Sequence, residues 1–315
     1  MPVPAVRAAG AAAASAAALA AYAAWVEPRR LVVRRRDLAL PNWPPTLDGL
    51  RVALVSDLHS GAPHVKGDRV REVAERVRRE HPDLALLLGD FVDPAVLLAT
   101  EIDLAEIAGP LATLEAPLGT FAVLGNHDWR HGGERVRDAL RDEGIPVLEN
   151  DALEVRGAPA PLWVAGVADE IARFADVGAA LLRVPADAAV LLLSHDPDVF
   201  PRVPARVALT VSGHTHGGQI NVPVVRRAVI PSRYGDRYSH GLVVEGGRHL
   251  YVTAGVGTSL LPLRFLKPPE VVVLTLRSRA SARHLPAGRS MRGMLGRRRV
   301  VQPARGAGTS QGGRR

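Results

Sequence analysis

The sequence predicts an α/β protein in which two mixed β-sheets pack together and helices cover their outer faces. Short apolar runs of strand length recur along the chain between residues 50 and 276. Segments with helical periodicity lie between the early runs, and predicted strands outnumber predicted helices. At 315 residues the chain is long enough to bury a core of this size.

The N-terminal segment is uncharged from Ala8 to Val26, which is about the length that a membrane-spanning helix needs. Tyr22 and Trp25 lie at the end of this stretch, and several arginines follow it. The positive-inside rule therefore predicts a single transmembrane helix in the cell membrane, with the rest of the chain in the cytoplasm. A cleaved signal peptide and a surface helix are the alternatives. We assign the membrane anchor and its basic flanking segment to residues 1–40.

The next segment, residues 41–277, contains the remaining predicted elements and forms one domain after a proline-rich linker at 41–45. Helices are predicted at 68–80 and 133–143, where apolar residues recur with a helical period. A hairpin is predicted at 241–255, with its turn at Gly246 and Gly247. The other strands are predicted from apolar runs bounded by turn residues, at 50–57, 83–90, 119–128, 161–167, 188–196, 205–216 and 270–276.

The positive charge of the chain is concentrated at its C-terminus. Residues 277–315 contain 11 arginines and no acidic residue, and subtracting them from the net charge of +8 leaves −3 for the rest. A segment of Arg, Gly, Ser, Ala and Pro cannot bury enough apolar surface to fold, so we predict a disordered tail at 278–315. A solvated tail without a defined partner is the first expectation, and non-specific contact with anionic lipid or nucleic acid is the alternative. No protein partner is predicted.

Five predicted strands end in Gly or Ser followed by a side chain that can bind a metal. In chain order these side chains are Asp57 and His59, then Asp90, then Asn126 with His127 and Asp128, then His195, and finally His214 and His216. A lone Asp or His at such a position is more often a turn, capping or structural residue, but the ordered succession favours a common site at the strand ends. The chain has no cysteine, so the ligands are nitrogen and oxygen atoms, which suit manganese, iron or zinc.

A pair of divalent ions about 3.5–4 Å apart needs one ligand that both ions share. Asp90 is the natural bridge because a carboxylate has two oxygens. Asn126 would add a neutral oxygen and so leave more of the positive charge available to a phosphate.

The order D-x-H, G-D, G-N-H-D, H and G-H-x-H resembles that of the calcineurin-like metallophosphoesterases, over about residues 50–276. The resemblance implies a four-layer αββα fold with two divalent metal ions, manganese first among them. It implies one ion held by Asp57, His59, Asp90 and His216, and a second held by Asp90, Asn126, His195 and His214. It also implies that His127 is the catalytic histidine and that Asp128 is hydrogen-bonded to it.

The sequence "GHTHGGQI" and residues 255–271 resemble the membrane-associated bacterial phosphodiesterases that are similar to UDP-2,3-diacylglucosamine hydrolase-like proteins. This chain has no long insertion of the kind that covers acyl chains in that hydrolase. The resemblance implies hydrolysis of phosphodiester or pyrophosphate bonds by a metal-bound hydroxide, with lipid-linked or UDP-sugar-lipid substrates as candidates. A nucleotide or nucleic-acid phosphodiesterase is the alternative, and a non-catalytic scaffold is less favoured because every ligand position is filled.

Two further residues are predicted to support the substrate site. Arg264 is a candidate to contact a substrate phosphate through both guanidinium nitrogens, although a structural salt bridge is the first expectation. Asp93 is expected to lie behind the ligands or near the substrate, with a helix cap as the alternative.

Overall fold

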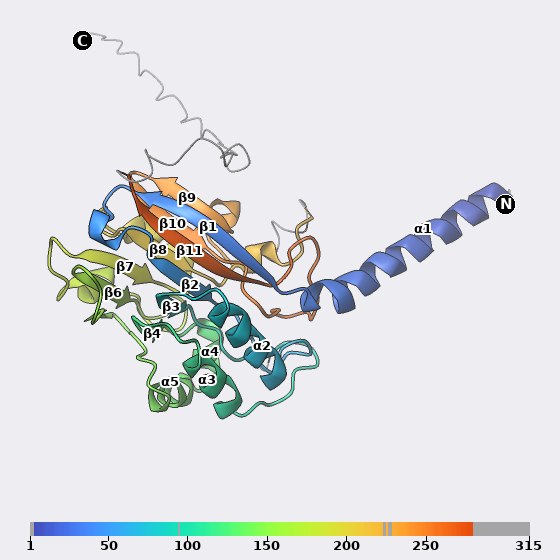
Figure 1. Cartoon of the computed structure of the whole chain (residues 1–315). Helices are drawn as coiled ribbons and strands as arrows, with labels where there is room; N and C mark the ends of the chain where they lie inside the picture. Colours follow the sequence, from blue (N-terminus) through green and yellow to red (C-terminus); the bar gives the residue numbers. More distant parts are fainter. Residues whose placement is uncertain (1–2, 94, 223–224, 226–228, 280–315) are drawn as a thin grey trace, which may run out of the picture.

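Two β-sheets form the centre of the protein in the computed structural model, which describes residues 3–93, 95–222, 225 and 229–279 (Figure 1). The first sheet has the strand order β1-β11-β2-β3-β4. Its strands are β1 (Val32–Leu40), β2 (Arg51–Val55), β3 (Leu84–Leu87), β4 (Thr120–Ala122) and β11 (Glu270–Ser278). Strands β2, β3 and β4 run parallel, and β11 runs antiparallel to β2.

The second sheet has six strands in the order β5-β6-β7-β8-β10-β9. Its strands are β5 (Asp151–Glu154), β6 (Leu162–Gly166), β7 (Ala189–Leu193), β8 (Leu209–Ser212), β9 (Gly241–Glu245) and β10 (Arg248–Val252). The four inner strands run parallel, and the two edge strands run antiparallel to their neighbours. The sequence predicted every strand of this sheet except β5, and the β9–β10 hairpin turns where it was expected.

Six α-helices lie among the described residues, and short 3-10 or π turns connect several of them to the strands. The helices are α1 (Val3–Ala21), α2 (Gly67–Arg78), α3 (Ala105–Ala112), α4 (Asn126–Arg130), α5 (Gly133–Asp142) and α6 (Val177–Leu181). The shorter turns are η1 (Tyr22–Val26), η2 (Glu27–Arg29), η3 (Pro45–Leu47), η4 (Pro197–Arg202), η5 (His216–Gly218) and η6 (Gly235–Tyr238).

The alternation of side chains along each strand divides the apolar core into three clusters. Leu54 and Leu86 of the first sheet and Leu191 of the second belong to the cluster between the sheets. The side chains next to them in sequence point the opposite way and pack against α2, α3 and α5 on the first sheet, or against α6 and η4 on the second. Strands β3 and β7 are continuous apolar runs because both of their faces are buried. The predicted arrangement of two mixed sheets between outer helices is therefore confirmed.

The predicted boundary between anchor and domain at residue 40 differs from the structure. Residues 32–40 form β1, an edge strand that pairs in parallel with β11. Arg34 forms an ion pair with Glu270, and Arg35 forms one with Glu80, so these arginines belong to the folded domain. The strand was not predicted because charged residues fill its middle. Its buried apolar residues, Leu38 and Leu40, alternate only at its end.

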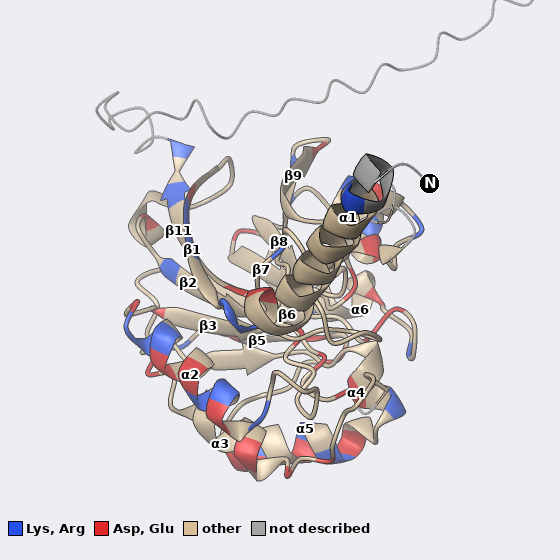
Figure 2. Cartoon of the chain, turned by 90° about the vertical axis from the view of Figure 1, so that its right-hand side faces the viewer, with Lys and Arg blue, Asp and Glu red and all other residues tan. Residues whose placement is uncertain are grey.

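Helix α1 projects away from the two sheets (Figure 1) and carries almost no charge, whereas α2 and α5 carry both charge signs (Figure 2). The helical stretch from Ala9 to Arg29 is long and apolar enough to cross a membrane, and almost none of it is buried. A signal sequence would meet the same criterion. The predicted disordered tail lies outside the described residues from position 280 onward.

Candidate metal centre

The side chains that the sequence predicted as metal ligands lie in loops at the carboxyl ends of five parallel strands. Asp57 and His59 follow β2, Asp90 follows β3, Asn126 follows β4, His195 follows β7, and His214 and His216 follow β8. In a sandwich of two such sheets these strand ends meet at one edge, which is where α/β proteins commonly bind ligands.

The backbone is left-handed at five of these positions. The φ angles are 52° at Asp57, 47° at His59, 55° at Asp90, 67° at His214 and 50° at His216. This conformation costs about 1–2 kcal/mol per residue other than glycine and is concentrated at functional sites. It lets the chain turn sharply after each strand, so that the side chains point inward.

Asp57, His59 and His216 form one group of buried donor atoms, all within 4.8 Å of one another. The two Nε2 atoms of His59 and His216 lie 3.0 Å apart. Oδ1 of Asp57 lies 3.6 Å from Nε2 of His216 and 3.9 Å from Nε2 of His59. The donors therefore converge from two loops of different sheets.

Asp90, His195 and His214 form a second group of the same size. Nε2 of His195 lies 3.0 Å from Oδ2 of Asp90 and 3.2 Å from Nδ1 of His214. Asn126 lines the same cavity as Asp90 and His214, and its buried Oδ1 has no hydrogen-bond partner among the described residues.

Asp90 lies between the two groups. Its Oδ2 is 3.6 Å from Nε2 of His59 in the first group and 3.0 Å from Nε2 of His195 in the second. Its Oδ1 accepts a hydrogen bond from the backbone N–H of His127 at 2.9 Å. This arrangement leaves Oδ2 as the atom that both groups share.

Two glycines allow the loops to come this close. A Cβ atom on Gly125 would lie 2.2 Å from Oδ1 of Asp90, and one on Gly213 would lie 2.4 Å from Oδ2 of Asp57. Such distances are far inside van der Waals contact, so any larger residue would displace the carboxylates.

Two of the four histidines predicted as ligands, His214 and His216, are held neutral, as metal binding requires. Burial lowers the pKa of His195, whereas the carboxylates of Asp90 and Asp57 outweigh burial and raise that pKa. Burial lowers the pKa of His214 to about 3, and the positive charge of His195 acts in the same direction. Burial also lowers the pKa of His216 well below its usual range, and His59 and Arg264 lower it further. Together with the orphaned Asn126 oxygen and the facing imidazole nitrogens, the donor set fits divalent ions bound by nitrogen and oxygen.

Asp93 occupies the position that the sequence analysis gave to Asp128. Its Oδ1 is 2.9 Å from Nδ1 of His127, and its Oδ2 is 3.0 Å from Nδ1 of His59. Burial raises the pKa of Asp93, but the hydrogen bonds to the two histidines outweigh it and hold the pKa well below its usual range. Because Asp93 is fully buried behind the histidines, the prediction that it contacts substrate is wrong, and its support of a ligand agrees with the other prediction.

Asp128 holds the backbone and not the imidazole of His127, so that prediction is corrected. Its carboxylate accepts hydrogen bonds from the backbone N–H groups of Asp90, Phe91, Val92 and Gly125, at 2.8, 2.8, 3.2 and 2.9 Å. The bonds join the loop after β3 to the start of α4. Asp128 therefore stabilises the loop that carries Asp90.

Arg264 is completely buried, so its predicted contact with a substrate phosphate is also wrong. Its guanidinium donates to the carbonyl oxygens of Gly257 and Ala254, each at 2.8 Å. One of its nitrogens lies 3.3 Å from Nδ1 of His216. Arg264 therefore supports a predicted ligand from behind.

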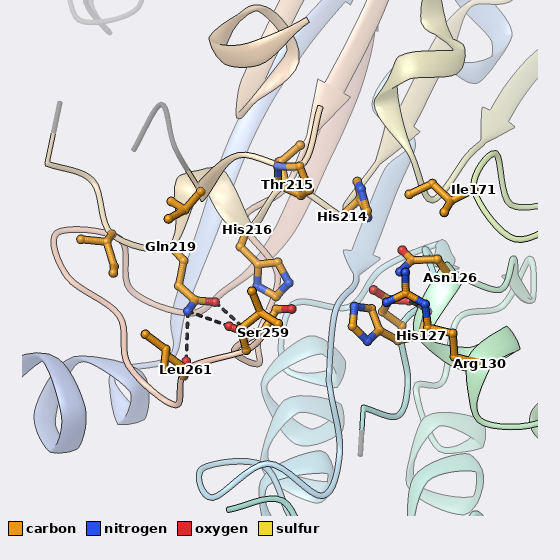
Figure 3. A pocket seen from close by; sticks show the side chains of 15 residues that line it. Asn126, His127, Arg130, Ile171, His214, Thr215, His216, Gln219, Ser259 and Leu261 are labelled. Carbon is orange, nitrogen blue, oxygen red and sulfur yellow. Dashed lines mark hydrogen bonds between the residues drawn. The ribbon is translucent and has the colours of Figure 1, made fainter. Parts of the chain in front are cut away.

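A cavity of about 300 Å³ opens beside the two groups (Figure 3). Asp90, Asn126, His127, His214 and His216 form its polar side. The rest of the lining is mainly apolar and includes Ile171, Ile220, Val229, Pro231, Leu260 and Leu261. The sequence alone does not reveal these apolar lining residues, because they come from three separate loops.

Arg130 and Gln219 are among the other polar residues that line the cavity. Arg130, at the end of α4, lines it beside Asn126 and His127 (Figure 3). Its position four residues after Asn126 on the same helix is the signal that could have identified it. Gln219 fixes the loop of the apolar wall by bonding to the backbone of Ser259 and to the carbonyl oxygen of Leu261, at distances of 2.8 to 3.1 Å.

Comparison with known proteins agrees with this arrangement. Residues 50–218 match the family model described as calcineurin-like phosphoesterase. A protein of Aquifex aeolicus named "Uncharacterized metallophosphoesterase" is 33% identical over 240 residues, which cover 74% of this chain and 87% of the relative. The "Phosphodiesterase YaeI" of Escherichia coli is 35% identical over 62% of this chain and 71% of its own length.

A third relative, from Danio rerio, is named "Transmembrane protein with metallophosphoesterase domain" and is 28% identical over 76% of this chain and 56% of its own length. The matched region of the family model contains the loops after β2, β3, β4, β7 and β8. The chain belongs to the calcineurin-like phosphoesterase family, whose members are hydrolases that act on phosphoric ester bonds.

Proposed function

We propose that the protein is a membrane-anchored phosphodiesterase that uses two divalent metal ions. The observation that carries the proposal is the pair of donor groups that share Oδ2 of Asp90 at one side of a cavity. In this proposal one ion is held by Asp57, His59, Asp90 and His216, and the second by Asp90, Asn126, His195 and His214. When bound, such ions withdraw charge from the phosphate oxygens and lower the pKa of an attacking water.

The protein's own side chains then bind the phosphate and move a proton. Nδ1 of His127 is held by Asp93, so its Nε2 is the ring nitrogen left for the cavity that His127 lines. We assign His127 the donation of a proton to the leaving oxygen. We assign Arg130 the phosphate contact first given to Arg264, because Arg130 lines the cavity and Arg264 is buried.

The lining of the cavity favours a substrate with an apolar part. Leu260, Leu261 and Ile171 in the lining suit an acyl or prenyl chain attached to the phosphate. Among the described residues that line the cavity there is no Phe, Tyr or Trp on which a base would stack. Lipid-linked phosphodiesters without a nucleobase are therefore favoured over nucleotides and nucleic acid, and the same absence counts against UDP-sugar lipids.

The exposed helix α1 supports anchorage in a membrane. The name of the Danio rerio relative agrees with it. Arg29 and Arg30 follow the helix, which favours the cytoplasmic side for the catalytic domain. Manganese is the metal we propose first, because a mixed set of imidazole, carboxylate and amide ligands suits it.

The proposal is tested with the full chain in nanodiscs, loaded with manganese and assayed on bis-p-nitrophenyl phosphate, p-nitrophenyl phosphate and lipid phosphodiesters. Hydrolysis of the diester that a chelator abolishes and manganese restores is expected. Asp90→Asn should remove activity and reduce the bound metal together. Full activity of this variant with two ions bound would refute the role of Asp90.

A second pair of variants tests the phosphate contact. Arg130→Ala should lower kcat/KM by about 10–100-fold, since a charge-assisted hydrogen bond is worth about 1.5–3 kcal/mol. Arg135→Ala is the matched control, because Arg135 is exposed on the next helix and does not line the cavity. Equal kinetics of the two variants would remove Arg130 from the site.

A further inference from the structure

Three leucines combine two unfavourable features. Leu98, Leu260 and Leu266 are exposed by 74, 69 and 59%, and their φ angles are 66°, 61° and 56°. A left-handed backbone is strained for leucine because its Cβ comes too close to the following carbonyl oxygen, and glycine or asparagine would relieve this strain. Exposed apolar side chains at such positions indicate that these leucines contact a partner and do not serve to stabilise the domain.

The three leucines lie around the base of the apolar helix. The backbone N–H of Leu97 donates to the carbonyl oxygen of Leu260 at 2.9 Å, which joins the loop of Leu98 to that of Leu260. The backbone N–H of Leu266 donates to the buried carboxylate of Glu27 in η2 at 2.9 Å. The three positions are therefore held near the point where the N-terminal helix meets the domain.

The same loop is tied to the helical segment at other points. The backbone N–H of Arg264 donates to the carbonyl oxygen of Ala23 at 2.9 Å. The rings of Tyr22 and Phe265 pack edge to face with their centroids 6.5 Å apart. Trp25, in the turn that continues α1, is itself 63% exposed. The exposed apolar surface thus continues from the helix onto the loop.

We infer that Leu98, Leu260 and Leu266, here called the leucine rim, insert into the surface of the bilayer that α1 crosses. The inference rests on the membrane anchorage proposed above. Because Leu260 also lines the cavity beside the donor groups, the rim leads from the bilayer to the site. A lipid phosphodiester would then reach the site from the membrane without passing through water.

A polar cavity at the same base supports a bilayer as the partner. It measures about 440 Å³ and is lined by Arg29, Pro63, His64, Lys66, Asp68, Arg69 and Glu72. Nε2 of His64 is 2.9 Å from the carbonyl oxygen of Pro262, so this cavity adjoins the loop that carries the rim. Arg69 is buried and paired with Glu72, so Arg29 and Lys66, both exposed, are the basic side chains that would face lipid phosphates beside the leucines.

The depth of the rim can be measured without reference to activity. The chain has no cysteine, so Leu98→Cys, Leu266→Cys and Leu182→Cys each provide one site for an environment-sensitive fluorophore on the full chain in phosphatidylglycerol-containing nanodiscs. Leu182 is the matched control, an 83% exposed leucine at the end of α6, which packs against β5 and β6.

The expected result is strong quenching by shallow spin-labelled lipids at 98 and 266, and at least fivefold weaker quenching by aqueous iodide than at 182. Equal exposure to iodide at all three positions overturns the inference. Shielding that persists without lipid and increases with protein concentration also overturns it, because a second copy of the chain would then cover the rim.

Kinetics separate this inference from the proposed activity. Leu98→Glu and Leu266→Glu should raise KM for a phosphodiester lipid in vesicles at least tenfold and leave kcat/KM for bis-p-nitrophenyl phosphate unchanged, whereas Leu182→Glu should change neither. If the fluorophores at 98 and 266 are shielded by the bilayer but the protein hydrolyses no lipid, the proposed substrate is refuted and insertion of the leucine rim is still supported. An unchanged KM for the lipid in both Leu98→Glu and Leu266→Glu would refute the delivery of lipid to the site by the leucine rim.

Discussion

Replacing Asp93 with asparagine should weaken one of the two proposed metal sites selectively. Oδ1 of Asp93 accepts the backbone N–H of Ala95 at 2.9 Å and faces His127, whereas Oδ2 faces only Nδ1 of His59. The Ala95 N–H will hold the amide oxygen of Asp93→Asn at the Oδ1 position, so the NH₂ group replaces Oδ2. An NH₂ group cannot accept a hydrogen bond from the Nδ1–H of His59. To accept a hydrogen bond from this NH₂ group instead, Nδ1 must lose its proton, and the neutral imidazole then carries its proton on Nε2. Nε2 is the nitrogen that faces His216.

The magnitude follows from the single hydrogen bond that is lost. A hydrogen bond to a charged group contributes about 1.5–3 kcal/mol, and loss of the group behind a ligating histidine typically lowers metal affinity about 10–100-fold. We expect a loss of this size for one ion and unchanged binding of the other, measured by titration calorimetry of the metal-free protein. Turnover should recover at high metal concentration, because His127 keeps its partner.

The matched control is Asp103→Asn. Oδ1 of Asp103 accepts the backbone N–H of Ala105 at 3.0 Å, so it forms the same turn as Asp93 but has no histidine beside it. This variant should bind both ions as the parent does. Two unchanged binding constants in Asp93→Asn would refute the reasoning, and so would equal weakening of both.

Three other perturbations have expected outcomes. His127→Ala should lower kcat by about 10²–10⁴-fold with two ions still bound; a matching loss of metal would mean that His127 is a ligand. Burial raises the pKa of Glu270, but His240, the Ala254 N–H and Arg34 outweigh it and lower the pKa to about 2. A lowered pKa in the folded state stabilises the protein fully above the ordinary value of 4.5, and this contribution of about 3 kcal/mol is lost as the pH falls towards 2. Urea unfolding of Glu270→Gln should lack this acid-dependent change; an unaltered pH profile would contradict it. Gly213→Ala would place Cβ 1.9 Å from Oγ of Ser56, which should cost about 1–3 kcal/mol and displace Asp57, so an unchanged melting temperature and metal content would exclude this packing.

The strand-end loops were predictable because their signal is local. An apolar run, a glycine or serine and then Asp, His or Asn can be recognised within ten residues, and parallel strands place such ends at one edge. The two mixed sheets between outer helices and the place of Asp90 between both donor groups agree with expectations drawn from those motifs and the family resemblance. The metal ligation itself stays a prediction until ions are measured.

The errors concern features that depend on distant contacts. Asp93 and Asp128 both lie near His127 in sequence, and the choice between them depends on how the loop after β3 packs on α4. The burial of Arg264 depends on carbonyl oxygens gathered from the loop after β10. Strand β1 was missed because its arginines find carboxylate partners on β11 and α2's C-terminal turn only in the folded chain.

The position of β11 constrains how the domain assembles. The last strand of the domain lies between β1 and β2, so the first and final segments must meet before the sheet is continuous. Contacts between such distant parts of a chain form slowly. In a nascent chain, β1 and β2 would therefore lack the strand that joins them until translation reached residue 278. During that interval the unpaired strands are exposed to aggregation, which makes the early chain a natural client for chaperones.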